Sequence, residues 1–134
     1  MVGILIISHS KKVAEGVVEI ARQMAGTELA LEACGGDREG GIGTDPDAIA
    51  AALEKLSGSD GVVIIADLGS AVMSAELVLD TLPPERREWL IIANAPLVEG
   101  AVLAAVEAAV GKNLAEVAEA AALAFQMQKV ERRR

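Results

Sequence analysis

The sequence is poor in aromatic residues. Among its 134 residues it has one tryptophan, Trp89, one phenylalanine, Phe125, and no tyrosine. Such a chain has no set of aromatic platforms on which nucleic-acid bases or sugar rings stack. The formal net charge of −8 also disfavours nucleic acid, because an acidic protein repels the phosphate backbone. We therefore expect no nucleic-acid partner.

Cysteine and histidine are scarce as well. Cys34 is the single cysteine, so the chain can form no internal disulfide and no thiol cluster for a metal. His9 is the single histidine, which disfavours a histidine metal site. We expect no metal and no cofactor.

Long hydrophobic runs are absent too. The apolar runs are shorter than the roughly 20 residues that span a bilayer. The start, MVGILIISHS, lacks the basic segment of a signal peptide. These features predict a cytoplasmic protein without a membrane partner.

Hydrophobic residues nevertheless make up 52% of the chain, enough for an aliphatic core. The length fits one domain, which we expect to span residues 1–134. Its end, KVERRR, is a basic tail from about residue 129 to 134, interpreted as a solvated terminus.

Four short apolar runs do not alternate with polar residues, which is typical of strands buried on both faces. The runs cover residues 2–7, 29–33, 61–67 and 89–95.

Helical patterns lie between and after these runs. Ser10 is a good cap for a first helix, in which Val13, Val17, Ile20 and Met24 recur at helical spacing. Further helices are predicted near residues 44–56, 70–82, 96–110 and 114–125. Strands separated by helices run parallel with right-handed crossovers. We therefore predict an α/β fold, a three-layer α/β/α sandwich around a mainly parallel four-stranded sheet. For a sheet of this type we expect the strand order 2-1-3-4.

In open parallel sheets, ligands bind outside the carboxyl ends of the strands. His9 directly follows the first strand, and Asp67 ends the third. A carboxylate there is expected to hold one ring nitrogen of His9 and leave the other facing outward as a phosphoryl acceptor. The alternative is a structural histidine. Hydrolysis by a Ser-His-Asp set has weak support, because no G-x-S-x-G elbow is present.

Helix starts and loops near His9 are candidate phosphoryl-binding elements. Ser10 opens a helix whose first N–H groups and dipole attract anions. Gly43 and Thr44 lie in a glycine-rich loop, and Gly69 and Ser70 begin the helix after the third strand. The alternatives are a flexible connection and a plain strand–helix turn. Neither loop matches a nucleotide-binding motif.

Two lysines and an apolar set complete the candidate site. Lys11 and Lys12 stand in the first helical turn, where cations are unfavourable unless an anion visits. The alternative is that they are ordinary solvated lysines. Leu68, Val72 and Met73 are either a docking rim for partner proteins or ordinary core residues.

These motifs resemble one known family in combination. The segments that carry the likeness are VGILIISHSKKVAEGVVEIARQM, GGIGTD, VVIIADLGSA and NAPLVEGAVLAA. Together they resemble the phosphotransferase subunits, DhaM, of bacterial dihydroxyacetone kinases that depend on the phosphoenolpyruvate phosphotransferase system. The wider relatives are the EIIA domains of the mannose transporter family, which share the α/β sandwich.

The resemblance implies a phosphotransferase mechanism. His9 matches the phosphoryl carrier, and Asp67 matches the residue that orients its ring. The carrier protein HPr would phosphorylate Nε2 of His9, which would pass the group to ADP bound on the kinase subunit DhaL. That nucleotide would phosphorylate dihydroxyacetone bound to DhaK. Family members are typically dimers, so a homodimer is expected.

Some relatives are longer, with carrier-protein and enzyme I segments fused behind this domain. The chain ends at its last predicted helix, so we expect the single-domain form. Ser10 stands where mannose-transporter relatives usually have glycine, and the loop D-L-G-S-A also favours the dihydroxyacetone branch. The alternatives are an EIIA component of a mannose-family transporter and a non-catalytic module that binds a small ligand.

Overall fold

The computed structural model of the chain describes residues 1–131. Residues 132–134 of the predicted basic tail lie outside the described residues. The strands are β1 (Gly3–Ser8), β2 (Leu31–Gly35), β3 (Val62–Ala66) and β4 (Leu90–Ile92). The helices are α1 (Lys11–Ala25), α2 (Pro46–Lys55), α3 (Gly69–Asp80), α4 (Pro84–Arg87), α5 (Leu97–Ala109), α6 (Leu114–Leu123) and the 3₁₀ turn η1 (Ala124–Gln126).

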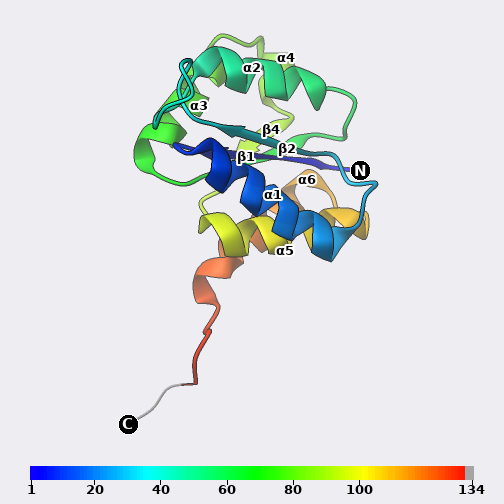
Figure 1. The fold of residues 1–134 in the computed structure, drawn as a ribbon. Coiled ribbons are helices and arrows are strands. Elements are labelled where there is room, and N and C mark those ends of the chain that lie inside the picture. Colours follow the sequence, from blue (N-terminus) through cyan, green and yellow to red (C-terminus); the bar gives the residue numbers. More distant parts are fainter. Residues whose placement is uncertain (132–134) are drawn as a thin grey trace.

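The four strands form one parallel sheet of order β2-β1-β3-β4, as the sequence predicts. Figure 1 shows α1, α5 and α6 below the sheet and α2, α3 and α4 above it. The predicted three-layer sandwich is therefore confirmed.

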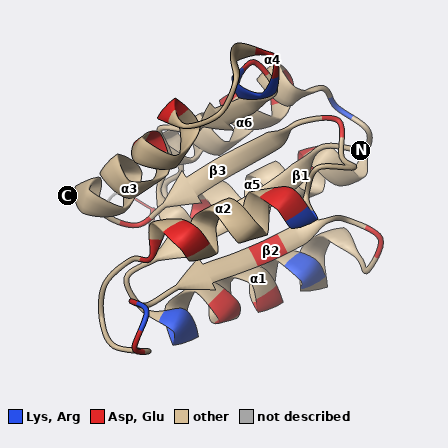
Figure 2. Ribbon diagram, turned by 90° about the horizontal axis from the view of Figure 1, so that it is seen from above, with Lys and Arg blue, Asp and Glu red and all other residues tan. Residues whose placement is uncertain are grey.

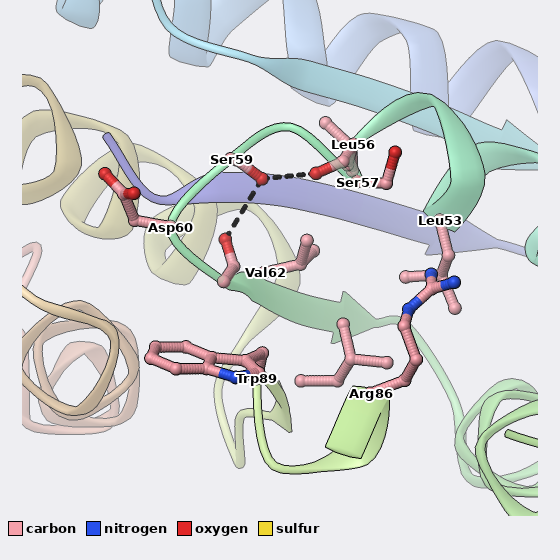
Figure 3. A pocket seen from close by; sticks show the side chains of 10 residues that line it. Leu53, Leu56, Ser57, Ser59, Asp60, Val62, Arg86 and Trp89 are labelled. Carbon is pink, nitrogen blue, oxygen red and sulfur yellow. Dashed lines mark hydrogen bonds between the residues drawn. The ribbon is translucent and has the colours of Figure 1, made fainter. Parts of the chain in front are cut away.

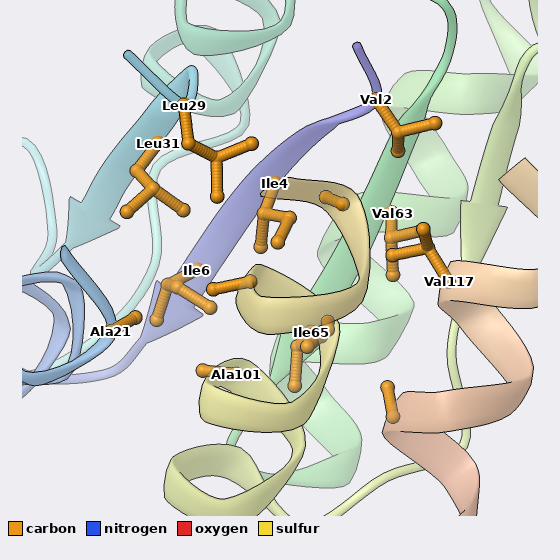
Figure 4. Close-up of a cluster of buried hydrophobic side chains, with 14 of the residues drawn as sticks. Val2, Ile4, Ile6, Ala21, Leu29, Leu31, Val63, Ile65, Ala101 and Val117 are labelled. Carbon is orange, nitrogen blue, oxygen red and sulfur yellow. The ribbon is translucent and has the colours of Figure 1, made fainter. Parts of the chain in front are cut away.

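The core lies on both faces of β1 and β3. Successive side chains of a strand point to opposite faces. Ile4 and Ile6 accordingly pack with α1, α5 and α6, where Figure 4 shows them beside Ile65. Leu5 and Ile7 pack with α2 and α3 on the other face. Every residue of β1 is buried, including the serine at its end.

The prediction of full burial is wrong for the two edge strands. All three residues of β4 are only partly buried, and so are three of the five in β2. An edge strand has a neighbour on one side only, so solvent reaches it. The limits of β2 also differ from the predicted range, because the strand begins at Leu31 rather than at residue 29.

The spacing that predicts α1 does not mark its buried face. Only Val17 of the predicted set is buried, together with Ala14 and Ala21. The others are exposed: Val13, Ile20 and Met24. The inner face consists of small residues because α1 packs closely against β2 and α5. The short helix α4 was not predicted, since the proline pair before it indicates only a helix end.

Within residues 1–131, none of the helices combines the length and the apolar character needed to cross a membrane.

Candidate functional site

The strand register places Ser8 beside Asp67. Strands β1 and β3 are paired with Ile7 opposite Ala66, and the Asp67 N–H donates to the Ile7 carbonyl at 3.1 Å. One residue further along, Ser8 and Asp67 point to the same face of the sheet. The Ser8 hydroxyl donates to Asp67 Oδ2 at 2.8 Å. The parallel pairing of two apolar strands thus builds the base of the site.

His9 follows Ser8 at the carboxyl end of β1, and both of its ring nitrogens have partners. Nδ1 lies 2.9 Å from Asp67 Oδ1, and Nε2 lies 2.6 Å from Ser70 Oγ. An ionised carboxylate can only accept, so Nδ1 carries the proton and Nε2 accepts the Ser70 O–H. The side chains of His9 and Asp67 are each 19% exposed, so the ring lies at the surface but is held on its inner side.

Asp67 accepts four hydrogen bonds. Oδ1 receives His9 Nδ1–H and the Leu68 N–H, while Oδ2 receives the Ser8 hydroxyl and the His9 N–H. Partial burial raises the pKa of Asp67, but the hydrogen bonds from His9 and Ser8 and the nearby imidazole outweigh it and hold the pKa below its ordinary value. The carboxylate is therefore ionised at neutral pH and able to stabilise positive charge on the ring.

Ser10 caps α1, as the sequence predicts. Its hydroxyl accepts the Val13 N–H at 3.3 Å, and α1 begins immediately beside His9. Gly35, at the end of β2, lets this helix start approach the sheet: a Cβ there would lie 2.5 Å from the Ser10 carbonyl oxygen. The first turn of α1 thus lies next to the imidazole, with its positive dipole end at the site.

The first turn of α1 has no acidic residue and carries two exposed lysines, Lys11 and Lys12. Figure 2 shows basic residues at both ends of α1 and acidic residues between them. The positive end of the helix and two ammonium groups therefore flank the same edge of the sheet.

Hydrogen bonds from Gly43 and Thr44 hold the glycine-rich loop next to His9 and α3. The Gly43 N–H donates to the His9 carbonyl at 2.9 Å, with Gly43 at φ 152°, in the region that glycine favours. The Thr44 hydroxyl bonds Ser74 Oγ at 2.7 Å. Both groups that the sequence suggested as phosphoryl contacts have internal partners in this state, and they position the loop against His9 and α3.

Gly69 and Ser70 begin α3, directly after Asp67 and Leu68. The first N–H groups of a helix have no partner within it, so those of Gly69 and Ser70 are left for an acceptor outside α3. Of the predicted phosphoryl-binding residues, Ser70 is the one in direct contact with the ring.

Exposed apolar side chains lie around His9. Leu68 is 59% exposed, Met73 is 65% exposed and Ile42, on the glycine-rich loop, is 78% exposed. Val72 is partly buried. The core interpretation therefore fails for Leu68 and Met73, which form an exposed rim suited to a protein partner.

The sequence analysis did not identify Ser8, Ser74 or Ile42 as part of this region. A signal for Ser8 was present: it is the one polar residue of an otherwise aliphatic strand, directly before the histidine. Ser74 and Ile42 carry no such signal, because only the packing of α3 and the loop brings them here.

Cys34 is buried near the end of β2. Burial raises the pKa of the Cys34 thiol, and the negative charge of Asp45 raises it further. The thiol is protonated at neutral pH and is no competing nucleophile.

A separate pocket lies at the opposite end of the sheet. Figure 3 shows Trp89 near the start of β3, Arg86 below Leu53, and Ser59 bonded to backbone carbonyls. Its cavity is about 280 Å³. The charged groups there are used in surface ion pairs, Arg86 with Glu54 and Asp60 with the terminal amine. This end offers no side-chain pair comparable to His9 and Asp67.

Comparison with known proteins gives a consistent result. Residues 3–118 match the EIIA-man family model, described as PTS system fructose IIA component. The phosphoryl donor subunit DhaM of the PEP-dependent dihydroxyacetone kinase of Klebsiella michiganensis is 40% identical over 134 residues, covering 98% of this chain and 28% of the relative. The corresponding subunit of kinase 2 of Listeria innocua is 39% identical over 113 residues, covering 84% of this chain and 90% of the relative.

The chain thus spans little more than a quarter of the Klebsiella relative but matches nearly all of the Listeria one. Among solved structures, a protein of unknown function, EF1359, is 34% identical with a TM-score of 0.80, over 90% of this chain and 92% of that one. On the matched model, the two subunits and the shared fold, the chain belongs to the EIIA-man family, and within it to the DhaM group.

Proposed function

We propose that this protein is a phosphohistidine carrier that accepts a phosphoryl group on Nε2 of His9 and passes it on. The observation that carries the proposal is the His9 ring, tied to Asp67 through Nδ1 and presented at the surface with Nε2 outward. Ser70, the start of α1 and the start of α3 are the groups that would receive the phosphoryl oxygens.

The chemistry needs only alignment and charge stabilisation. The Nε2 lone pair attacks the phosphorus of a phosphorylated donor, the donor's N–P bond breaks, and its imidazole leaves with the electron pair. The His9 ring gains positive character and keeps its Nδ1 proton, which the ionised Asp67 stabilises. Ser70 O–H turns from Nε2 to a phosphoryl oxygen. In the return step an acceptor oxygen attacks the same phosphorus, and Nε2 is the leaving group.

The partners are proposed from the resemblance to the DhaM subunits. We propose HPr as the donor and ADP on the subunit DhaL as the acceptor, with DhaK holding the dihydroxyacetone that is finally phosphorylated. The names of the relatives, phosphoryl donor subunits of dihydroxyacetone kinases, support this choice over a mannose-family transporter. The exposed apolar rim around His9 suits two partners that bind in turn. In this scheme the protein is one subunit of a phosphotransferase and acts in the cytoplasm as a single domain of residues 1–134.

We further propose a homodimer. The segment after α6 leaves the body of the domain in Figure 1. Phe125, Met127 and Val130 in this segment, together with Leu123 at the end of α6, are exposed apolar side chains that a second copy would cover. Sedimentation equilibrium tests this: a mass near 28 kDa, twice the 13.8 kDa chain, is expected, and a monomer at micromolar concentration would reject the dimer.

Phosphorylation from radiolabelled phosphoenolpyruvate with enzyme I and HPr tests the carrier function. An acid-labile, base-stable phosphate on His9 is expected, discharged by adding DhaL loaded with ADP. No label on the protein while HPr is charged would favour a ligand-binding module instead. Label that ADP-loaded DhaL leaves in place, but that a transporter IIB component removes, would favour the mannose-family alternative. Stoichiometric reaction with a serine-directed inhibitor would favour a hydrolase.

A further inference from the structure

We propose that Ser8 is a positioning residue for phosphoryl transfer: its hydroxyl locks the Asp67 carboxylate so that Oδ1 faces Nδ1 of His9. The inference rests on the proposed function and deepens it. It concerns a residue that never touches the phosphoryl group.

The hydrogen-bond directions at Ser8 are fixed by its surroundings. A hydroxyl has one hydrogen, and Ser8 gives it to Asp67 Oδ2 at 2.8 Å, since the carboxylate can only accept. The Ser8 hydroxyl oxygen in turn accepts the Ser10 N–H at 3.0 Å. Ser8 thereby links the Asp67 carboxylate to the backbone N–H of Ser10, at the start of α1. Ser8 and Ser10 flank His9 in the sequence.

Three donors besides the imidazole hold the carboxylate. Two are backbone groups, the His9 N–H to Oδ2 at 3.0 Å and the Leu68 N–H to Oδ1 at 2.8 Å. The third is the Ser8 hydroxyl. Bonds on both oxygens fix the plane of the carboxylate, and that plane decides whether Oδ1 meets Nδ1. Among residues 1–131, Ser8 is thus the one residue besides His9 whose side chain bonds this carboxylate.

A packing role alone does not account for a serine here. Ser8 is 0% exposed, and among residues 1–131 it is the one polar residue of the buried class. A buried hydroxyl is unfavourable unless it is hydrogen-bonded, and alanine would fill nearly the same volume without that requirement. The bonds to Asp67 and Ser10 are what make serine suitable at this position.

The tautomer of the single histidine provides a direct test. Because the chain has one histidine, nitrogen-15 NMR of the ring in intact protein gives signals that belong to His9 alone. The wild type is expected to be mainly the Nδ1–H form. In Ser8→Ala the Nε2–H form should increase. The HPr-dependent rate should fall about tenfold, the loss expected for one hydrogen bond to a charged group.

The pH dependence separates positioning from folding. Loss of one donor raises the pKa of Asp67, so the acid limb of the transfer rate should move to higher pH in Ser8→Ala. Ser8→Thr keeps the hydroxyl and should restore the tautomer. Ser59→Ala, which removes a serine hydroxyl at the opposite end of the sheet, is the matched control and should leave tautomer and pH profile unchanged.

A double-mutant comparison tests whether Ser8 acts through Asp67, even if Ser8→Ala also lowers the stability of the fold. If Ser8 acts through Asp67, Ser8→Ala should change neither tautomer nor pH profile further in an Asp67→Asn background. Equal effects in both backgrounds, or a wild-type tautomer in Ser8→Ala, would overturn the proposal. If HPr cannot phosphorylate the wild type, the proposed function is rejected. The tautomer measurement would still test whether Ser8 positions the Asp67 carboxylate.

Discussion

The two ends of the sheet differ in the groups that are arranged there for a reaction. The amino end has a cavity of about 280 Å³ beside Trp89, but its charged groups are engaged in exposed ion pairs. The carboxyl end instead presents His9 and Asp67, whose ring nitrogens and carboxylate are all hydrogen-bonded in fixed directions. A group-transfer site used by large partners needs an exposed atom with a rigid base, and depth would only hinder access.

The largest contrast is expected from removal of the imidazole. His9→Ala eliminates the acceptor nitrogen, so labelling from phosphorylated HPr should fall to background. Trp89→Ala, at the other end, should keep labelling within about twofold of wild type, as expected for a position remote from the reacting atoms. Autoradiography of both variants after incubation with phosphorylated HPr measures the labelling. Stoichiometric label on His9→Ala would show that the phosphoryl acceptor is another residue.

Asp67→Asn is expected to have the next largest effect. The amide keeps the shape of the carboxylate but not its charge, and it no longer enforces the Nδ1–H tautomer. The transfer rate should drop about 100-fold, within the range for loss of a catalytic acid–base partner. Rapid-quench kinetics measures the loss. A rate within threefold of wild type would mean that Asp67 does not orient the ring.

Glycine-to-alanine substitutions at the two ends of the sheet are expected to differ in their effects on stability and phosphorylation. Gly35→Ala puts a Cβ 2.5 Å from the Ser10 carbonyl oxygen, so α1 must shift away from His9. We expect a loss of about 1–3 kcal/mol of unfolding free energy, typical of overpacking, and slower phosphorylation. Gly58→Ala meets no atom within 4 Å and should change neither. Urea titration and labelling test both, and equal stability of the two variants would contradict the close approach.

Acid should weaken the carboxyl end selectively. The folded pKa of Asp67 is lowered, so the stability it contributes is fully present above its unfolded pKa of about 4 and is lost as the pH falls toward the folded pKa. Wild type should therefore lose more unfolding free energy than Asp67→Asn between about pH 5 and pH 3. Urea unfolding across this range checks the sign. Parallel curves for the two proteins would show that the carboxylate is unperturbed.

The smallest effect is expected from Ser59→Ala at the amino end. Its hydroxyl donates to the Leu56 and Gly61 carbonyls, so its loss should cost about 1 kcal/mol of unfolding free energy. Phosphorylation should stay unchanged. Fluorescence of the single tryptophan, Trp89, follows the unfolding, and a slower phosphorylation would indicate coupling between the two ends.

The order of strands and helices followed from the sequence because apolar runs and helical spacing are local signals. Right-handed crossovers then left few possible topologies, and the strand order expected for a sheet of this type is confirmed. The inner face of α1 was not predicted, because close packing selected Ala14 and Ala21 over the larger Ile20 and Met24. Local hydrophobicity does not reveal how near a helix lies to its neighbours.

The site divides in the same way. By itself, the sequence determined that a single histidine follows a buried strand and that an aspartate ends another, since both statements concern the order of residues along the chain. Only the tertiary structure decided which ring nitrogen Asp67 holds, that Ser70 contacts the other, and that Ser8 anchors the carboxylate. Those contacts join residues about 60 positions apart, so they depend on strand register and helix placement, which the whole fold sets.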